Sequence, residues 1–397
     1  MTIGGSTAAA ELAGLGVWQA KPPAITREER QQRIERARAL TEATGAGALL
    51  VNAGASLRYF AGVPWGATER LVAMVLPLQG EPVIVCPRFE LGSLQADLLV
   101  DADIRLWEED EDPYALVADA LTGIGATTLA VDPMLPFQMA ERLRRADPSL
   151  SLVDGAPAID GVRMRKSPAE LALMTQAKAM TLEVQRRAAR ILAPGITTTE
   201  VKKFIDEAHR ALGASGSSFC IVQYGRATAF PHGLPGEQRL AEGDLVLIDT
   251  GCTVEGYHSD ITRTYAFGTV GDEERAIWDL EKEAQAAAFA AAQVGASCES
   301  VDAAARLVLT KGGLGPDYRL PGLPHRTGHG IGLSIHEPAY LVRGDRTPLD
   351  VGMCFSNEPM IVVPDRFGVR LEDHFFMTQA GPRWFTEPQP AIDRPFD

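Results

Sequence analysis

Cysteine and histidine are both scarce in this chain of 397 residues. The five cysteines are widely spaced and form no C-x-x-C pair, which argues against a disulfide framework and against a thiolate zinc site. Such thiols are typical of a reducing compartment, so we expect a cytoplasmic protein. Histidine occurs seven times, never before His209, and six of the seven lie between residues 232 and 374. Imidazole chemistry, if present, therefore belongs to the second half of the chain.

Long apolar runs and excess positive charge are also absent. No stretch approaches the ~20 apolar residues of a membrane span. The first residues, MTIGGSTAAAELAGLGVWQA, lack the basic region of a signal peptide. With 38 basic against 52 acidic residues, the formal net charge is -14, which repels phosphate backbones and anionic lipids. We therefore expect a protein that binds neither nucleic acid nor membranes.

The residues that are present indicate two domains, the first of them small. Residues 1–25 are predicted to be a tail of small residues. Thr26 and Glu29 have the spacing of a capping box, which predicts a helix from there to about residue 43. Four strands are predicted after it, at residues 47–51, 71–78, 82–86 and 127–131. Residues 26–160 should therefore form an α/β domain.

A junction follows at GVRMRKSPAEL. Ser167 is a suitable N-cap, Pro168 fits the first helical position, and Glu170 completes a capping box, so a long helix should reach about residue 192. Beyond it, helices alternate with hairpins, and DLVLIDTG at 244–251 is the strongest predicted strand. Residues 165–397 are the predicted second domain, and the fold class is α/β with α+β character.

The hairpin predicted over residues 244–267, DLVLIDTGCTVEGYHSDITRTYAF, carries two acids. A turn centred between Val254 and Glu255 would place Asp249 and Asp260 directly opposite each other, with Cβ atoms ~4.5–5.5 Å apart. Facing carboxylates behind an apolar strand are destabilising unless a cation lies between them.

A second predicted hairpin has the same construction. SNEPMIVVPDRFGVRLEDHFF, residues 356–376, has a turn centred on Asp365 that would place Glu358 opposite Glu372. Arg370 precedes Glu372 by two residues and therefore points to the same face of the strand. Two hairpins with facing acids favour a duplicated architecture that closes around one centre.

Taken singly, each acid could be a carboxylate paired with a neighbouring arginine. Four of them near HRTGHGIGLSIHEP, residues 325–338, favour a metal centre instead. His329 supplies a nitrogen ligand, and the glycines around it allow close backbone approach. This oxygen-rich set suits Mn²⁺, Co²⁺ or Zn²⁺ and excludes copper(I) and iron–sulfur chemistry. Four carboxylates balance two divalent ions, which predicts a hydrolase that activates water.

The motifs IDTG, YHSDITRT, HRTGHGIGL, HEP, NEP and RLED occur in this order. With them the chain resembles the metal-dependent pita-bread peptidases, which include Xaa-Pro dipeptidases (prolidases), aminopeptidase P and methionine aminopeptidase. The similarity is close over residues 165–385, and SLRYFAGV at 56–63 looks like the family's N-terminal domain. The resemblance implies a creatinase/prolidase-type N-terminal domain, a pita-bread catalytic domain and a homodimer.

The resemblance also implies roles for single residues. Two divalent ions, Mn²⁺ first and Co²⁺ or Zn²⁺ as alternatives, would be bound by Asp249, Asp260, His329, Glu358 and Glu372. Glu358 would also carry a proton from water to the leaving nitrogen. The other catalytic or substrate-contacting positions are His232 in FPHG, His325, His336 and Arg370. Of these, His325 and His336 would flank the reacting carbonyl. His258 and His374 are interpreted as structural neighbours.

The predicted substrate is a small Xaa-Pro peptide. Because the proline amide lacks an N–H and its ring fixes φ, the enzyme needs an apolar pocket for the ring, and Phe230 and Tyr224 are candidates to line it. An Xaa-Pro dipeptidase is the first choice, and an aminopeptidase P-type enzyme acting on longer Xaa-Pro peptides is the second. A metal-dependent lyase and a non-catalytic binding module are further hypotheses. The complete ligand set argues against creatinase-like chemistry, and FPHG argues against methionine aminopeptidase.

Overall fold

The computed structural model describes residues 3–396 and divides into two compact units. One unit is Ala24–Arg163, and the other combines the chain up to Pro23 with the chain from Met164 onward. None of the helices between residues 3 and 396 has the length and apolarity of a membrane span. Both units mix helices with sheets, as the predicted fold class requires.

The unit Ala24–Arg163 is built on one six-stranded sheet in the order β4-β3-β2-β1-β5-β6. Its strands are β1 (Ala48–Asn52), β2 (Ala73–Pro77), β3 (Val83–Pro87), β4 (Asp103–Trp107), β5 (Thr128–Val131) and β6 (Ser151–Asp154). Its helices are α2 (Arg27–Ala43), α3 (Ala55–Ala61), η1 (Arg88–Glu90), α4 (Leu91–Asp97), α5 (Pro113–Gly123), α6 (Phe137–Ala146) and α7 (Ala156–Arg163). The sheet is antiparallel in its centre, β1-β2-β3, and parallel towards both edges.

The four predicted strands of this unit are present, but β4 and β6 were missed. Both are edge strands with partly exposed faces, so they lack the continuous apolar runs that identify β1 and β2. The predicted start of α2 is confirmed, since the Thr26 side chain accepts a hydrogen bond from the Glu29 N–H at 3.1 Å.

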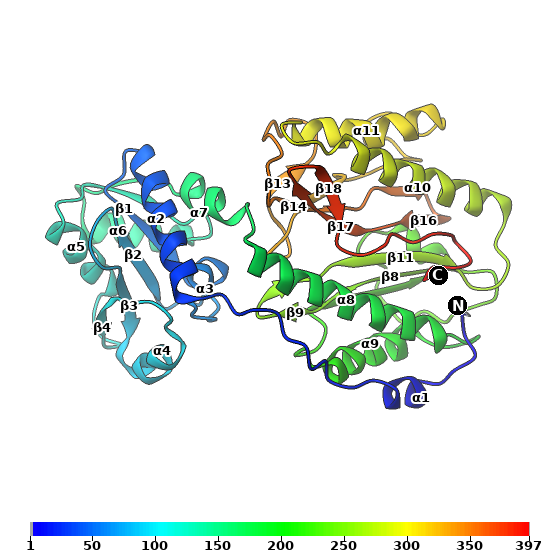
Figure 1. Cartoon of the computed structure of the whole chain (residues 1–397), viewed down its shortest axis with the longest axis horizontal. Helices are drawn as coiled ribbons and strands as arrows, with labels where there is room; N and C mark the ends of the chain where they lie inside the picture. The colour runs from blue at the N-terminus through cyan, green and yellow to red at the C-terminus, as the bar shows by residue number, and fades with distance from the viewer. Residues whose placement is uncertain (1–2, 397) are drawn as a thin grey trace. The chain divides into compact units, whose positions relative to one another are not determined.

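The other unit has two halves of similar construction (Figure 1). Helices α8 and α9 cover strands β7 and β8 on one side, and α10 and α11 cover strands β13 and β16 on the other. The helices are α1 (Ala8–Ala13), α8 (Pro168–Arg190), α9 (Thr198–Leu212), η2 (Gly225–Ala229), α10 (Asp272–Ala291) and α11 (Cys298–Lys311). This repetition agrees with the duplicated architecture predicted from the two acidic hairpins.

Between the helices lie two main sheets, in the orders β11-β8-β7 and β13-β12-β14-β17-β18, and the small pairs β9-β10 and β15-β16. The strands are β7 (Phe219–Tyr224), β8 (Leu245–Gly251), β9 (Thr253–Val254), β10 (Tyr257–His258), β11 (Ile261–Ala266), β12 (Gly328–Gly330), β13 (Glu337–Leu341), β14 (Cys354–Asn357), β15 (Met360–Val363), β16 (Phe367–Arg370), β17 (Asp373–Thr378) and β18 (Gly381–Trp384).

The capping box predicted for the long helix α8 is confirmed. The Ser167 side chain accepts a hydrogen bond from the Glu170 N–H, and the Glu170 carboxylate accepts one from the Ser167 N–H. Pro168 occupies the first turn, where its missing N–H costs nothing. The helix ends at Arg190, close to the predicted residue 192.

The segment predicted to be a tail, residues 1–25, is packed against this unit over its described part. It contains α1, and the side chains of Ile3, Leu12, Leu15 and Trp18 pack on the core between α8 and α9. Glu11, which is 2% exposed, forms ion pairs with Arg187 and Arg190. The interpretation as a tail was wrong for these residues. The many small residues suggested a flexible segment, but four apolar side chains spaced along it pack on the core.

Candidate metal centre

The first acidic hairpin has a register two residues away from the predicted one. Asp249 of β8 lies opposite Thr262 of β11, not opposite Asp260. The loop consists of Glu255 and Gly256, whose φ values of 48° and 80° are those of a two-residue hairpin turn. A positive φ at a residue other than glycine is uncommon, so the sequence did not indicate this loop. Asp260 keeps the predicted face and becomes a diagonal neighbour of Asp249.

The second acidic hairpin has the predicted register. Asn357 pairs with Asp373, and β15 pairs with β16 in the same alignment, so Glu358 lies opposite Glu372. The turn contains Asp365 with a φ of 61°, at the centre that the sequence indicated.

One β-bridge joins the two hairpins. Thr262 pairs with Glu372, the Glu372 N–H donates to the Thr262 carbonyl at 3.1 Å, and the Thr262 hydroxyl donates to Glu372 Oε2 at 2.7 Å. Four side chains from adjacent strand segments therefore follow one another across the site. This first row consists of Asp249, Thr262, Glu372 and Glu358.

A second row runs beside the first. Extending the antiparallel bridge by two residues sets His374 opposite Asp260, and His374 also pairs with Ser356 of β14. The Ser356 hydroxyl accepts a hydrogen bond from the His329 N–H at 2.8 Å and donates to Glu358 Oε1 at 3.0 Å. The second row is thus Asp260, His374, Ser356 and His329, and the predicted ligands are divided between the two rows.

The acids of the two rows are buried together. Asp249, Asp260 and Glu372 are at most 7% exposed, and each has one carboxylate oxygen without a hydrogen-bond partner within residues 3–396. Burial, and then repulsion by the neighbouring carboxylates, raises the pKa of Asp260 and Glu372 well above the ordinary values. If all these acids ionised, the cluster would therefore have an excess of negative charge that the surrounding side chains do not balance.

His329 presents one nitrogen to these acids. Its Nδ1 lies 2.9 Å from the Gly330 carbonyl and donates to it, which leaves Nε2 as the acceptor. Nε2 lies 3.1 Å from Glu358 Oε1 and 3.9 Å from Asp260 Oδ2. A backbone carbonyl that accepts from the other ring nitrogen, and so fixes the tautomer, is typical of metal-binding histidines.

The residues present fit divalent cations. Three groups of side chains have ligand atoms within 4.8 Å of one another: Asp260, His329 and His336; Asp260, Glu372 and His374; and His329, Glu358 and Glu372. The groups overlap at Asp260, His329 and Glu372, and the orphaned oxygens of those acids need positive charge. Carboxylates with imidazole match the preferences of Mn²⁺, Co²⁺ and Zn²⁺.

Arg370 supplies part of that positive charge. Its Nη2 lies 2.5 Å from Asp249 Oδ2, its Nε donates to the Thr262 hydroxyl at 3.2 Å, and its Nη1 donates to the Pro231 carbonyl at 3.2 Å. The guanidinium is 4% exposed. Arg370 therefore does not simply pair with its neighbour Glu372. Its ion pair is with Asp249, on the first acidic hairpin.

The remaining predicted histidines gather near Glu358. The ring centroids of His336 and His329 are 4.2 Å apart. Glu358 lies close enough to His325 and His336 for its negative charge to oppose the lowering of their pKa values. His232 and His336 both reach solvent, although part of the His336 ring is covered, and His232 lies close enough to act on the pKa of His336. Burial lowers the pKa of His325, and burial together with His329 lowers that of His336 to about 4.

The candidates for a proline pocket have a different environment. Tyr224 is 4% exposed and packs with Val246 and Ile248 in the core beneath α8 and α9, so it does not face the acids. Phe230 packs against the opposite core. The sequence could not separate the two faces of β7 because its burial does not alternate cleanly.

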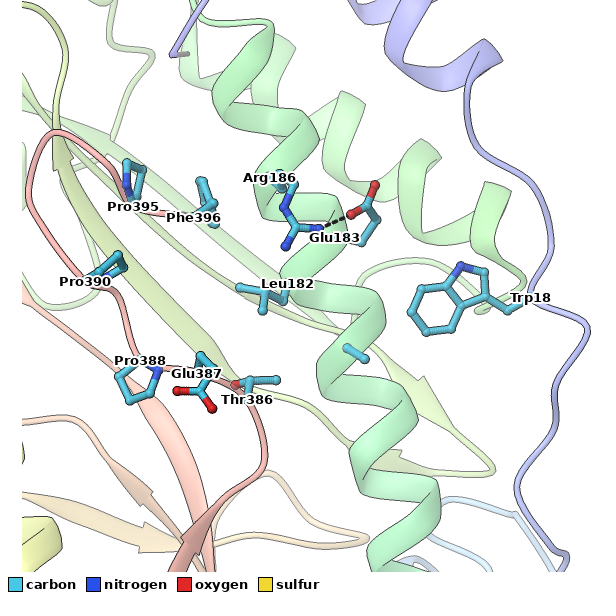
Figure 2. Close-up of a pocket in the computed structure, with 11 residues that line it drawn as sticks. Trp18, Leu182, Glu183, Arg186, Thr386, Glu387, Pro388, Pro390, Pro395 and Phe396 are labelled. Atoms are coloured by element: carbon cyan, nitrogen blue, oxygen red, sulfur yellow. Dashed lines mark hydrogen bonds and ion pairs between the residues drawn. The ribbon is translucent and has the colours of Figure 1, made fainter. Parts of the chain in front are cut away.

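A pocket of about 460 Å³ lies beside α8, away from these rows (Figure 2). Apolar and proline side chains line it, among them Trp18, Leu182, Pro388, Pro390 and Phe396, and Glu183 and Arg186 form an ion pair at its edge. Its lining includes none of the predicted ligands or catalytic histidines. The concentration of titratable groups, and not this hollow, marks the functional site.

One residue of the cluster was missed as a functional candidate. His374 was interpreted as structural, yet it lies in the second row among the acids. Its position two residues after Glu372 was the available signal, since strand alternation sets both side chains on one face.

Comparison with known families accounts for nearly the whole chain. The profile of Metallopeptidase family M24 matches residues 172–379. The profile of the Creatinase/Prolidase N-terminal domain matches residues 33–165.

Individual relatives agree with this match. A probable dipeptidase PepE of Mycobacterium tuberculosis is 38% identical over 88% of this chain and 92% of its own length. An Xaa-Pro dipeptidase of Lactobacillus helveticus is 33% identical over 83% of this chain and 90% of its own. Among solved structures, dipeptidase PepE from Mycobacterium ulcerans superposes with a TM-score of 0.85 at 37% identity, covering 95% of this chain and 99% of that one. A prolidase from Thermococcus sibiricus gives a TM-score of 0.82 at 29% identity, covering 90% and 97%.

Proposed function

The chain belongs to metallopeptidase family M24, and we propose that it is an Xaa-Pro dipeptidase that hydrolyses dipeptides with C-terminal proline. The observation that carries the proposal is the grouping of three buried carboxylates, the partly buried Glu358 and His329 in two adjacent rows. The Xaa-Pro specificity is supported by the name of the Lactobacillus helveticus relative and by the histidines beside the rows.

Two divalent ions would be held by Asp249, Asp260, His329, Glu358 and Glu372. Bound there, they would act as Lewis acids on the scissile carbonyl and lower the pKa of a water molecule. The ligand set accepts Mn²⁺, Co²⁺ and Zn²⁺, and among them we favour Mn²⁺ on the family resemblance.

Glu358 would move the proton. It is the most exposed acid of the cluster, with 14% of its side chain accessible, and the Ser356 hydroxyl orients its Oε1. Burial opposes ionisation of Glu358, but the neighbouring His329 outweighs it and lowers the pKa of Glu358. With metal bound at His329 Nε2, the cations would keep the Glu358 carboxylate ionised, so that it can accept a proton from water. It would then return that proton to the leaving proline nitrogen.

His336 would donate to the oxygen of the scissile carbonyl. With its pKa lowered to about 4 the ring is neutral at pH 7 and carries one N–H. His325 has a different capacity, because its Nδ1 donates to the Arg326 carbonyl at 2.6 Å and its Nε2 is left as an acceptor. His325 would therefore receive a hydrogen bond, for example from the substrate amine, and the predicted donor role passes to His336 alone.

A preference for dipeptides is supported by Arg326. The charge of this half-buried guanidinium lowers the pKa of both His325 and His336, so Arg326 lies close to both rings. It therefore places a cation near the expected position of the leaving group. The free carboxylate of a C-terminal proline would benefit from it, and a longer peptide would place a neutral amide there. His232 and Arg370 would complete the substrate contacts. We propose a homodimer on the resemblance alone, and light scattering tests it. A cytoplasmic location is proposed from the free, widely spaced cysteines.

The test is a peptidase assay with metal-loaded protein on three substrates: Ala-Pro, an Ala-Pro-Xaa tripeptide and a dipeptide without proline. We expect cleavage of Ala-Pro, little cleavage of the tripeptide and none of the third. Cleavage of the tripeptide with Ala-Pro left intact would establish the aminopeptidase P-type alternative. Metal binding without cleavage of any of the three would contradict the peptidase proposal and leave the lyase or binding-module hypothesis.

A further inference from the structure

His374 is the one imidazole of the two rows for which no role has been assigned. It is 0% exposed and is the second residue of β17, two positions after Glu372, with which it shares a face. On one side it faces Asp260, because the antiparallel bridge between Thr262 and Glu372, continued by two residues, aligns Asp260 with His374. On the other side it pairs with Ser356. The ring is therefore enclosed by the residues that surround the candidate metal centre.

The nitrogens of His374 differ from those of other buried histidines in this chain. His209, also 0% exposed, has Nδ1 2.9 Å from the Ser217 hydroxyl and Nε2 3.1 Å from the Thr181 hydroxyl. His329 has its Nδ1 on the Gly330 carbonyl. Within residues 3–396, neither nitrogen of His374 makes a hydrogen bond of good geometry, and the ring has only a weaker polar contact with the Asp260 backbone. A buried polar atom without a partner is costly, so a ligand is expected there.

The distances around the ring suit a cation better than a hydrogen bond. His374 Nε2 lies 3.8 Å from Glu372 Oε1, an oxygen that is itself buried and unpaired among residues 3–396. A hydrogen bond requires about 3.2 Å or less. Two atoms that each bind one ion at about 2.1 Å lie at most about 4.2 Å apart. An oxygen of Asp260 completes the group, with all three ligand atoms within 4.8 Å.

We propose that His374 is a sixth protein ligand of the metal centre, binding through Nε2 the ion that Asp260 and Glu372 also hold. The inference rests on the proposed metallopeptidase function. It gives the metal centre a second imidazole beside His329, which strengthens the binding of the ion it contacts and favours borderline metals over Mg²⁺ or Ca²⁺.

The test uses the full chain loaded with Co²⁺, with His374→Phe and His374→Cys as the variants. His374→Phe keeps an aromatic ring but removes both nitrogens, and one of the two ions should bind at least ~10–100-fold more weakly by calorimetry, with a changed visible spectrum. His374→Cys should add a thiolate-to-cobalt charge-transfer band in the near ultraviolet, because a thiolate at this position would bind the ion. His209→Cys is the matched control: it also replaces a buried imidazole, and it should leave both the affinity and the spectrum as in wild type.

Wild-type affinity and spectrum in His374→Phe would overturn the inference, and so would a folded His374→Cys without the new band. If His374→Phe does not fold, the band in His374→Cys decides alone. A wild-type chain that binds two ions and cleaves Ala-Pro while His374→Phe binds equally well would remove only the role of His374. A wild-type chain that binds no Co²⁺ would remove the proposed function as well.

Discussion

Arg370 and Asp249 form a buried ion pair that joins the two acidic hairpins, with 2.5 Å between Nη2 and Oδ2. The guanidinium is the nearest positive charge that the chain itself supplies to the acids, and its pKa is raised by Asp249 and Glu358 despite burial. In the metal-free protein this pair limits the repulsion among the carboxylates. Its contribution should therefore depend on whether metal is bound.

Replacing Arg370 by Gln should destabilise the metal-free protein by about 3–5 kcal/mol, because Asp249 is left buried without its partner. Added Mn²⁺ should reduce the difference in the free energy of unfolding between wild type and Arg370→Gln, since a bound cation neutralises Asp249. Urea unfolding with chelator and with Mn²⁺ measures both values. Arg366→Gln is the control, because its ion pair with Glu273 is exposed and should contribute less than about 1 kcal/mol. Equal losses with and without metal would contradict this account of Arg370.

Thr262→Val should weaken metal binding while keeping the fold. The hydroxyl donates to Glu372 Oε2 and accepts from Arg370 Nε, so its removal frees the Glu372 carboxylate to rotate. We expect a ~10–100-fold loss of metal affinity by calorimetry. Thr250→Val provides the comparison: its hydroxyl is also buried but donates to the Phe219 carbonyl, and metal affinity should not change. An unchanged affinity in Thr262→Val would show that the bridge does not orient the ligand.

Glu358→Gln should reduce kcat on Ala-Pro by about 10²–10⁴-fold, because the amide cannot accept the proton from water. The protein should stay folded, and Glu358→Ala should likewise abolish turnover. Metal content is measured in parallel so that loss of an ion is not mistaken for loss of the base. Glu387→Gln, a change outside the two rows, serves as the control. Activity retained in metal-loaded Glu358→Gln would remove the proton-transfer role.

The stability of the metal-free protein should fall as the pH rises. Because the folded-state pKa values of Asp260 and Glu372 lie well above the unfolded ones, the folded state binds more protons in between. Their contribution is complete below the unfolded pKa and is lost as the pH rises through the folded pKa. Bound metal should abolish this fall, since the ions replace the protons. Chemical unfolding from pH 5 to pH 9, with chelator and with Mn²⁺, compares the slopes.

Asp260→Asn should flatten the slope of the metal-free protein, because one of the two titrating acids is gone. Parallel curves with and without metal would show that the acids do not form one charged cluster.

Local features of the chain were readable from the sequence. The N-cap at Thr26 and the capping box at Ser167 use side chains within three residues of the groups they bond, and both starts were predicted. The loop around Asp365 also gave the correct register for Glu358 and Glu372. At the Glu255 loop, the predicted strand register was wrong by two residues. Glu255 has a positive φ, which nothing in the residue type indicates.

The sequence by itself determined which residues are acids and imidazoles, and which of them share a strand face, because a strand repeats every two residues. Only the tertiary structure decided that Thr262 pairs with Glu372 and thereby brings Asp260 beside His374. The two partners are 110 residues apart. The alternation of side chains along one strand does not determine which distant strand will lie beside it. The pairing of Thr262 with Glu372 is therefore selected by the packing of the two halves against each other.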